Sequence, residues 1–240
     1  MQVRQALSKA ARKAGIVNHD ECLYVPSIDF HSGLLQGAWL LHGLAISMKA
    51  SVCVEIGSAS GLSACHVGLA LKQMGQGRLY AIDPHTVTDW NDPEAVASLE
   101  MMRENMRKFK VEDYVEIIRD YSGNAAKNWT LPIDLLFIDG DHSYEGVKSD
   151  WEAFAPHVNP FGVVVFHDTT WDLERGPEWD GNRLGVPQFL EELRADGYPI
   201  ITINEHCGLS MVQATKGGRS LAKKHIRPAQ EKLKLLNKEK

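Results

Sequence analysis

The chain has 240 residues, of which 44% are hydrophobic and 24% are charged, and its formal net charge is −5 at pH 7. These values are typical of soluble globular proteins and exclude a disordered chain, and the length suits one large α/β domain. The negative charge gives no reason to expect nucleic acid as a partner, because phosphate binding needs a concentrated cationic face. The longest apolar stretch, residues 33–48, contains histidine, glutamine and glycine and is too short to span a bilayer.

Two further features indicate a cytoplasmic protein. The four cysteines form no CxxC pair, and two of them lie in a predicted buried strand and in the helix after it, which is typical of reduced thiols. Residues 1–15 carry basic side chains among isolated apolar ones, without the apolar core and the cleavage site of an export signal.

The first elements in chain order predict an α/β fold. A helix is expected over 33–48, within an N-terminal segment (1–50) that we interpret as a helical cap over the sheet edge or the ligand crevice. Short apolar runs bounded by Gly, Asp or Pro then predict buried parallel strands at 51–56, 78–82, 114–118, 133–138 and 162–166. Segments with apolar residues at three- and four-residue spacing predict crossover helices or turns at 62–74, 93–109, 122–129 and 143–158.

The end of the domain predicts an antiparallel closure. After a helix over 186–197, the strand-like runs 198–203 and 209–215 are separated only by NEHCG, a distance that suits a hairpin and is too short for a crossover helix. The expected fold is therefore a doubly wound, mostly parallel seven-stranded sheet whose last strand is antiparallel. Residues 216–240 are strongly basic, and we interpret them as a solvated terminal helix or tail, with an anionic or oligomeric contact as the alternative.

The loop after the first strand, VEIGSASG (54–61), is the strongest candidate for a cofactor site. In open α/β sheets ligands bind beyond the carboxyl ends of the strands. Gly57 and Gly61, which flank Ser58, let the backbone turn sharply and approach a ligand, and the next helix offers free N–H groups to a carboxylate. Glu55, just before the turn, suits a ligand with an ammonium or sulfonium cation and would repel a pyrophosphate.

Acidic residues also follow the second and third strands. Asp83 stands where a carboxylate can accept hydrogen bonds from both ribose hydroxyls of an adenosyl group. Asp120 stands where an adenine amino group would bind, with Tyr121 or Ser122 beside it. Taken alone, Asp83 could be a turn residue and Asp120 a helix N-cap. Three successive loops on one rim favour a shared ligand.

The fourth and fifth strands end in residues typical of a metal site. Neighbouring parallel strands lie about 5 Å apart, so Asp139 after one strand can share an ion with His167 and Asp168 after the other. This donor set suits Mg²⁺ or Mn²⁺ better than structural zinc. His142, whose ordinary pKa is near 6.5, is the candidate general base, with Asp139 beside it. The alternative is that the histidines are structural and Asp139 is a helix cap.

The motifs VEIGSASG, YAIDPH, IIRDYSGN and FIDGDHSYEGV…FGVVVFHDT are similar to those of class I S-adenosylmethionine-dependent methyltransferases over residues 50–215. The last of these motifs looks like that of the metal-dependent small-molecule O-methyltransferases, the branch that includes catechol-type, macrolide-sugar and cephalosporin-hydroxylase-like proteins. The resemblance implies a Rossmann-like fold and a methyltransferase domain over 51–215. It also implies that the loop Gly57–Gly61 binds the methionine end of the cofactor, that Asp83 binds the ribose, and that Asp120 and Tyr121 lie beside the adenine. Asp139 would lie next to the cofactor, and the metal would be held by Asp139, His167 and Asp168.

The predicted activity is methyl transfer to a hydroxyl of a small molecule, such as a sugar, a catechol or another diol, with a divalent metal and His142 as base. The alternatives are an N- or C-methyltransferase of the same fold, a nicotinamide-dependent oxidoreductase, and a binding module without turnover. The absence of GxGxxG from the first loop disfavours the oxidoreductase. Metal-independent turnover would favour the N- or C-methyltransferase.

Overall fold

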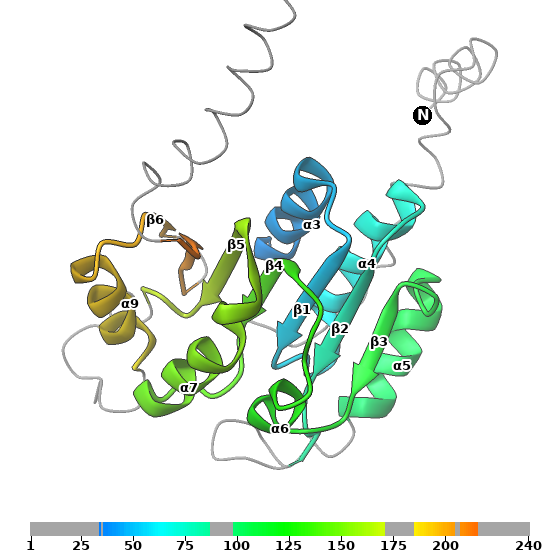
Figure 1. Cartoon of the computed structure of the whole chain (residues 1–240). Coiled ribbons are helices and arrows are strands. Elements are labelled where there is room, and N and C mark those ends of the chain that lie inside the picture. The colour runs from blue at the N-terminus through cyan, green and yellow to red at the C-terminus, as the bar shows by residue number, and fades with distance from the viewer. Residues whose placement is uncertain (1–33, 35, 87–97, 171–184, 205–206, 216–240) are drawn as a thin grey trace, which may run out of the picture.

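The computed structural model describes residues 34, 36–86, 98–170, 185–204 and 207–215. These residues contain a seven-stranded sheet in the order β3-β2-β1-β4-β5-β7-β6 (Figure 1). The strands are β1 (Val52–Ile56), β2 (Arg78–Ile82), β3 (Val115–Ile118), β4 (Ile133–Ile138), β5 (Val158–His167), β6 (Ile200–Ile203) and β7 (Leu209–Gln213).

The direction of each strand confirms the predicted sheet. β1 pairs in parallel with β2 and β4, β2 with β3, and β4 with β5. β7 pairs antiparallel with β5 on one side and with β6 on the other. The short connection between β6 and β7 therefore forms the expected hairpin, and five parallel strand ends meet at one edge of the sheet.

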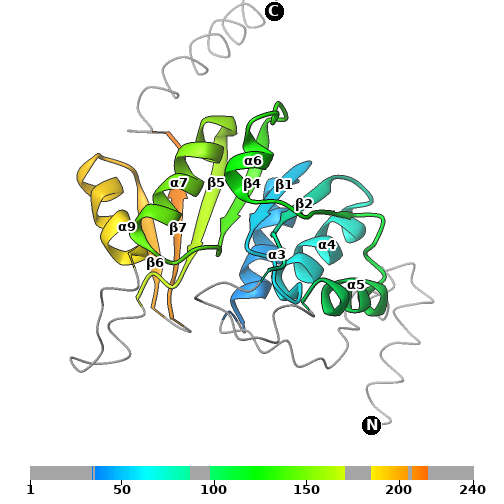
Figure 2. The same ribbon diagram turned by 90° about the horizontal axis from the view of Figure 1, so that it is seen from below.

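Helices cover both faces of this sheet, as Figure 2 shows from below. The helices on one face are α3 (Gly37–Met48), α4 (Leu62–Met74) and α5 (Ser98–Phe109), and those on the other are α6 (Ser122–Ala126), α7 (Tyr144–Phe154) and α9 (Val186–Ala195). A 3-10 turn, η2 (Ala155–His157), links α7 to β5. Each face has its own apolar cluster, in which α3, α4 and α5 bury Leu41, Leu71 and Met102, while α7 and α9 bury Phe154 and Phe189.

The fourth crossover differs from its prediction at the end of the helix. The helix ends at Phe154, and β5 begins at Val158, four residues before the predicted start of that strand. Pro156 lies in the turn between them and lacks the N–H that would continue the helix. Val158 pairs with Ile133, and the register then shifts before Leu135. The strand therefore extends beyond its continuous apolar run through this shift in register.

The described part of the N-terminal segment packs on a face of the sheet. Leu34 and Leu41 belong to the apolar cluster that also contains Leu209 of β7. Gly37 lies so close to Leu209 that a Cβ atom there would come within 2.6 Å of its Cδ1. The rest of the predicted cap, residues 1–33 and 35, and the basic segment 216–240 lie outside the described residues.

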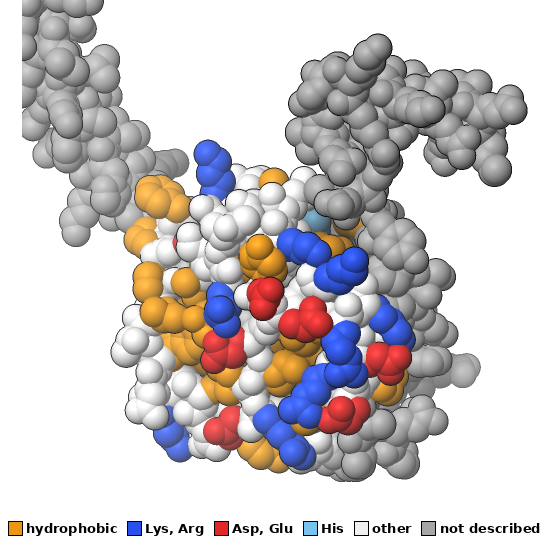
Figure 3. Space-filling view, turned by 90° about the vertical axis from the view of Figure 1, so that its right-hand side faces the viewer, with side chains coloured by type: hydrophobic (Ala, Val, Ile, Leu, Met, Phe, Trp, Pro, Cys, Tyr) orange, Lys and Arg blue, Asp and Glu red, His pale blue; other side chains and the backbone are white. Residues whose placement is uncertain are grey.

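The face that carries α5 and the sheet edge at β3 has charges of both signs. Lysine and arginine side chains alternate with aspartate and glutamate over the surface in Figure 3. Arg103–Glu100 (2.5 Å) and Lys108–Glu104 (2.7 Å) form ion pairs on α5, and Arg78–Glu116 (3.4 Å) joins β2 to β3. In the part of the chain that the structure describes, no helix combines the length and apolar character needed to cross a bilayer.

Candidate active site

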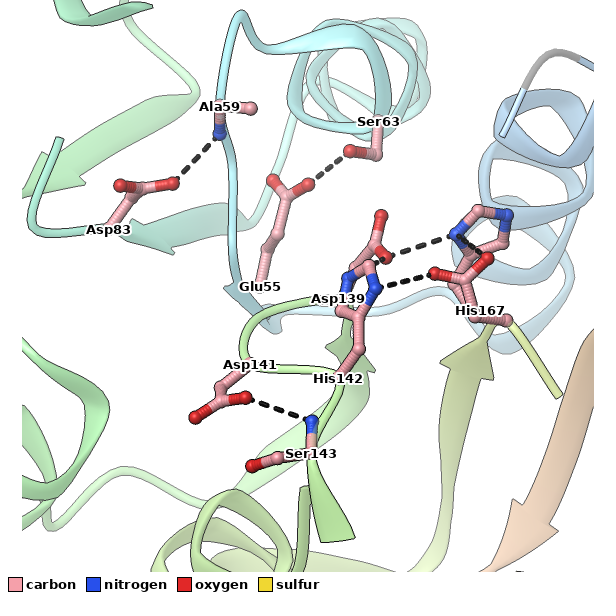
Figure 4. Close-up of polar contacts among 10 residues, drawn as sticks. Glu55, Ala59, Ser63, Asp83, Asp139, Asp141, His142, Ser143 and His167 are labelled. Atoms are coloured by element: carbon pink, nitrogen blue, oxygen red, sulfur yellow. Dashed lines mark hydrogen bonds and ion pairs between the residues drawn. The ribbon is translucent and has the colours of Figure 1, made fainter. Parts of the chain in front are cut away.

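The loop after β1 lies against the loop after β4, and both follow carboxyl ends of parallel strands (Figure 4). Gly57 has φ +85°, and its N–H donates to the carbonyl oxygen of Ile82 (2.9 Å). A Cβ atom on Gly57 would lie 2.1 Å from the carbonyl oxygen of Asp139. Gly57 is therefore needed both for its left-handed backbone and for the close approach of the two loops.

Glu55 is a buried acidic residue, and only one of its two carboxyl oxygens accepts a hydrogen bond from the described residues. Its side chain is 1% exposed, and the Ser63 hydroxyl donates a hydrogen bond to Oε1. Among the described residues, Oε2 has no hydrogen-bond partner. Burial raises the pKa of Glu55 to about 8, with the charges of Asp139 and Asp83 acting in the same direction and the Ser63 hydrogen bond acting against it. A cationic group would supply the missing partner, so this site fits the ammonium or sulfonium of S-adenosylmethionine.

Asp83 fastens the loop after β1 to the end of β2. Its Oδ2 accepts the N–H of Ala59 (2.9 Å), and its Oδ1 accepts the N–H of His85 (2.6 Å). The predicted ribose contact remains compatible with these bonds, because each carboxylate oxygen has a second lone pair. The bond to His85 is the turn role that the sequence allowed for Asp83, whereas the bond to Ala59 in the loop after β1 was not indicated by the sequence.

The third loop keeps an exposed aromatic ring at the same edge. Oδ1 of Asp120 accepts hydrogen bonds from the Asn124 side chain (2.9 Å) and the Tyr121 N–H (2.8 Å), and these bonds lower the pKa of Asp120. The Ser122 hydroxyl donates to Oδ1 of Asp150 (2.5 Å). The Tyr121 side chain is 60% exposed. Of the residues predicted beside the adenine, Ser122 is engaged elsewhere, while Tyr121 remains accessible.

Three side chains after β4 and β5 converge closely enough to hold a metal ion. Asp139, His142 and Asp168 each offer a ligand atom, and these atoms all lie within 4.8 Å of one another. Nδ1 of His142 lies 3.0 Å from Oδ2 of Asp168, and Nε2 lies 3.7 Å from Oδ1 of Asp139. Oδ1 of Asp168 is buried without a hydrogen-bond partner among the described residues. Two carboxylates and an imidazole suit a divalent cation.

The sequence predicts His167 as a metal ligand, but in the structure it lies next to the three-residue group and contacts Asp139. Its Nδ1–H donates to Oδ1 of Asp139 (3.0 Å), and its side chain is 6% exposed. Such a contact orients a ligating carboxylate. The structure thus brings all four predicted residues together, with His142 in the three-residue group and His167 beside Asp139.

The surroundings of His142 favour its protonated form. Burial acts to lower its pKa, but the hydrogen bond to Asp168 and the charge of Asp139 outweigh this effect, so the pKa is raised above its ordinary 6.5. The backbone of Asp168 has φ +57°, a left-handed conformation that residues other than glycine rarely adopt. Such strain is typical of residues held in place at functional sites.

Sequence reasoning missed two glycines that hold the loop after β4. The N–H of Gly185, just before α9, donates to the His142 carbonyl (2.7 Å), and a Cβ atom on Gly185 would lie 2.1 Å from the Tyr144 nitrogen. On α7, a Cβ atom on Gly146 would lie 2.4 Å from Cγ of Asp141. In the sequence, each of these glycines is an isolated glycine near the start of a helical run. Such a glycine can mark a place where another segment packs against the backbone, but the sequence does not show which segment that is.

Comparisons with known proteins find similarity over the segment that contains this site. A family model described as "Methyltransferase domain" matches residues 54–169. Uncharacterized protein R132 of Acanthamoeba polyphaga mimivirus is 34% identical over 121 residues, which are 48% of this chain and 50% of that protein. The aligned part thus spans only half the length of this curated relative.

Solved structures share the fold at low sequence identity. The O-methyltransferase TomG from Streptomyces achromogenes, involved in tomaymycin synthesis and crystallised with SAM, has a TM-score of 0.58 at 20% identity and covers 89% of both chains. The SAH-bound methyltransferase PaMTH1 from Podospora anserina has a TM-score of 0.59 at 19% identity, covering 81% of this chain and 84% of its own. The chain thus shares the class I methyltransferase fold with these proteins, and its residues 54–169 match a methyltransferase-domain model.

Proposed function

We propose that this chain transfers a methyl group from S-adenosylmethionine to a hydroxyl of a small molecule such as a sugar, a catechol or another diol. The main support is the contact between two sites of different chemistry. The Gly57 loop, beside the unpartnered carboxylate oxygen of Glu55, touches the backbone of Asp139, which belongs to the cluster with His142 and Asp168. A methyl donor and an acceptor hydroxyl would therefore meet at one edge of the sheet.

On the donor side, the chain's residues bind and orient a cationic ligand. Glu55 presents a buried oxygen to the positive end, and Asp83 holds the loop after β1 while facing the ribose. Exposed Tyr121 provides a surface beside the adenine. These groups lie at the carboxyl ends of β1, β2 and β3, in the order in which the parts of the cofactor would cross the edge.

On the acceptor side, the two carboxylates and the imidazole have different roles. Asp139 and Asp168 would hold Mg²⁺ or Mn²⁺, which lowers the pKa of a hydroxyl when bound. Asp168 keeps the proton of His142 on Nδ1, so that Nε2 is the nitrogen that accepts the hydroxyl proton. The acceptor oxygen then forms a bond to the methyl carbon as the bond from that carbon to sulfur breaks. Positioning supplies most of the rate enhancement.

His142 cannot use the same nitrogen as a base and as a metal ligand. We place the cation on the two aspartates because buried Oδ1 of Asp168 has no hydrogen-bond partner among the described residues and lies 3.5 Å from Nδ1 of His167, whereas both nitrogens of His142 face carboxylates. Mn²⁺ titration of His142→Ala, with Asp168→Asn as control, separates the roles. Retained Mn²⁺ affinity in His142→Ala supports the base, and its loss in that variant would make His142 a ligand.

The activity is tested with labelled S-adenosylmethionine and a panel of catechols, macrolide sugars and other vicinal diols. We expect an O-methylated product with Mg²⁺ or Mn²⁺, and loss of turnover in chelator that is restored by adding either ion. Products methylated on nitrogen or carbon, formed at full rate in chelator, would favour the alternative methyltransferases. We further propose a cytoplasmic enzyme whose partner is its small-molecule substrate rather than nucleic acid or a membrane.

A further inference from the structure

A buried aspartate on α7 has no part in the chemistry described so far. Asp150 is 5% exposed and shares a helix face with Val147, Trp151 and Phe154, which pack into the core. Burial raises the pKa of Asp150 to about 6, and the charge of Asp141 adds to this effect. A carboxyl group on a buried helix face is costly unless its contacts compensate for lost hydration.

The contacts of Asp150 reach two loops of the active-site edge. Its Oδ1 accepts the Ser122 hydroxyl (2.5 Å), and Ser122 begins α6 directly after Tyr121. Its Oδ2 faces Gly140, where an added Cβ atom would lie 3.2 Å from that oxygen and 3.1 Å from Cγ2 of Ile56. Gly140 follows Asp139 directly. Asp150 is thus the side chain between the loop after β3 and the loop after β4.

We propose that Asp150 is a positioning residue that locks the adenosine-binding loop after β3 to the loop that carries the methyl-transfer site. The Ser122 hydrogen bond fixes the start of α6, and hence the backbone next to Tyr121. The packing of Oδ2 on Gly140 fixes the backbone next to Asp139. This inference rests on the proposed function, because it takes Tyr121 and Asp139 as parts of one cofactor site.

Calorimetric titration with S-adenosylhomocysteine tests the proposal in full-length Asp150→Ala, Ser122→Ala, the double variant and Asp150→Asn. The matched control is Asp134→Ala. Asp134 also accepts hydrogen bonds, from the N–H groups of Ser51 and Val52, but it lies near the start of β4, at the opposite end of the strands from the site. Thermal unfolding of every variant measures structural damage separately from binding.

We expect the Kd to rise about 5- to 20-fold in Asp150→Ala and in Ser122→Ala, with no further rise in the double variant, because both substitutions break the same hydrogen bond. Asp150→Asn keeps an acceptor oxygen and should stay within about twofold of the unmodified protein. Asp134→Ala should lower the melting temperature without changing the Kd.

The proposal is overturned if Ser122→Ala leaves the Kd unchanged, if the two effects add in the double variant, or if Asp134→Ala raises the Kd as much as Asp150→Ala does. Failure of the proposed function has a different signature. In that case the unmodified protein itself does not bind S-adenosylhomocysteine.

Discussion

Replacement of Glu55 by glutamine should change how the stability of the free protein depends on pH. The pKa of Glu55 is raised from 4.5 to about 8 by its burial. A folded-state pKa above the unfolded value means that the folded protein binds one more proton between these two pH values. The stabilisation is therefore complete below pH 4.5 and is lost as the pH rises through about 8.

The expected slope is about 1.4 kcal/mol of unfolding free energy per pH unit, or about 3 kcal/mol between pH 5.5 and 7.5. Urea unfolding followed by tryptophan fluorescence measures this free energy in the unmodified protein and in Glu55→Gln. The difference between the two curves isolates Glu55 from other buried acids such as Asp150. Parallel curves across this window would show that Glu55 keeps an ordinary pKa, which would refute the reasoning from burial.

Three further substitutions test other parts of the site. Asp83→Ala should weaken S-adenosylmethionine binding about 10-fold or more and also lower the melting temperature, because the N–H groups of Ala59 and His85 lose their acceptor; unchanged affinity in calorimetry would remove Asp83 from the cofactor site. His142→Ala should lower kcat by about 10²- to 10⁴-fold and abolish the acidic limb of the kcat–pH profile, because that limb reports protonation of the base; near-normal kcat would exclude it as the base. Gly185→Ala should lower the free energy of unfolding by about 1–3 kcal/mol in a denaturant titration, because the added Cβ clashes with Tyr144. Gly43→Ala is the control and should not lower it, because an added Cβ there meets nothing within 4 Å. Equal stabilities of the two variants would contradict the close packing at Gly185.

The sheet could be predicted because its information is local. Each parallel strand contains a short apolar run, and the five residues between the last two strands leave room only for a hairpin. The start of β5 could not be predicted in the same way. Val158 joins the sheet through its pairing with Ile133 across a register shift, which no local pattern reveals.

The candidate site was predictable as a set of loops rather than as a set of contacts. The rule that ligands bind beyond parallel strand ends was enough to bring Asp139, His142, His167 and Asp168 together. Which histidine joins the two aspartates depends on side-chain direction, and that direction is fixed by tertiary packing. Asp150 could have been noticed, because the helical period places it on an apolar face, but its link to Ser122 spans 28 residues of chain.

The most direct test of the central claim is a calorimetric comparison of two cofactors. We predict that S-adenosylmethionine binds the purified protein at one site and that NAD⁺ gives no binding heat, because the open oxygen of Glu55 suits a cation, which favours the ionised form of the carboxyl group, and because the first loop lacks the GxGxxG pattern of dinucleotide-binding loops. Saturable binding of NAD⁺, without binding of S-adenosylmethionine, would contradict the account.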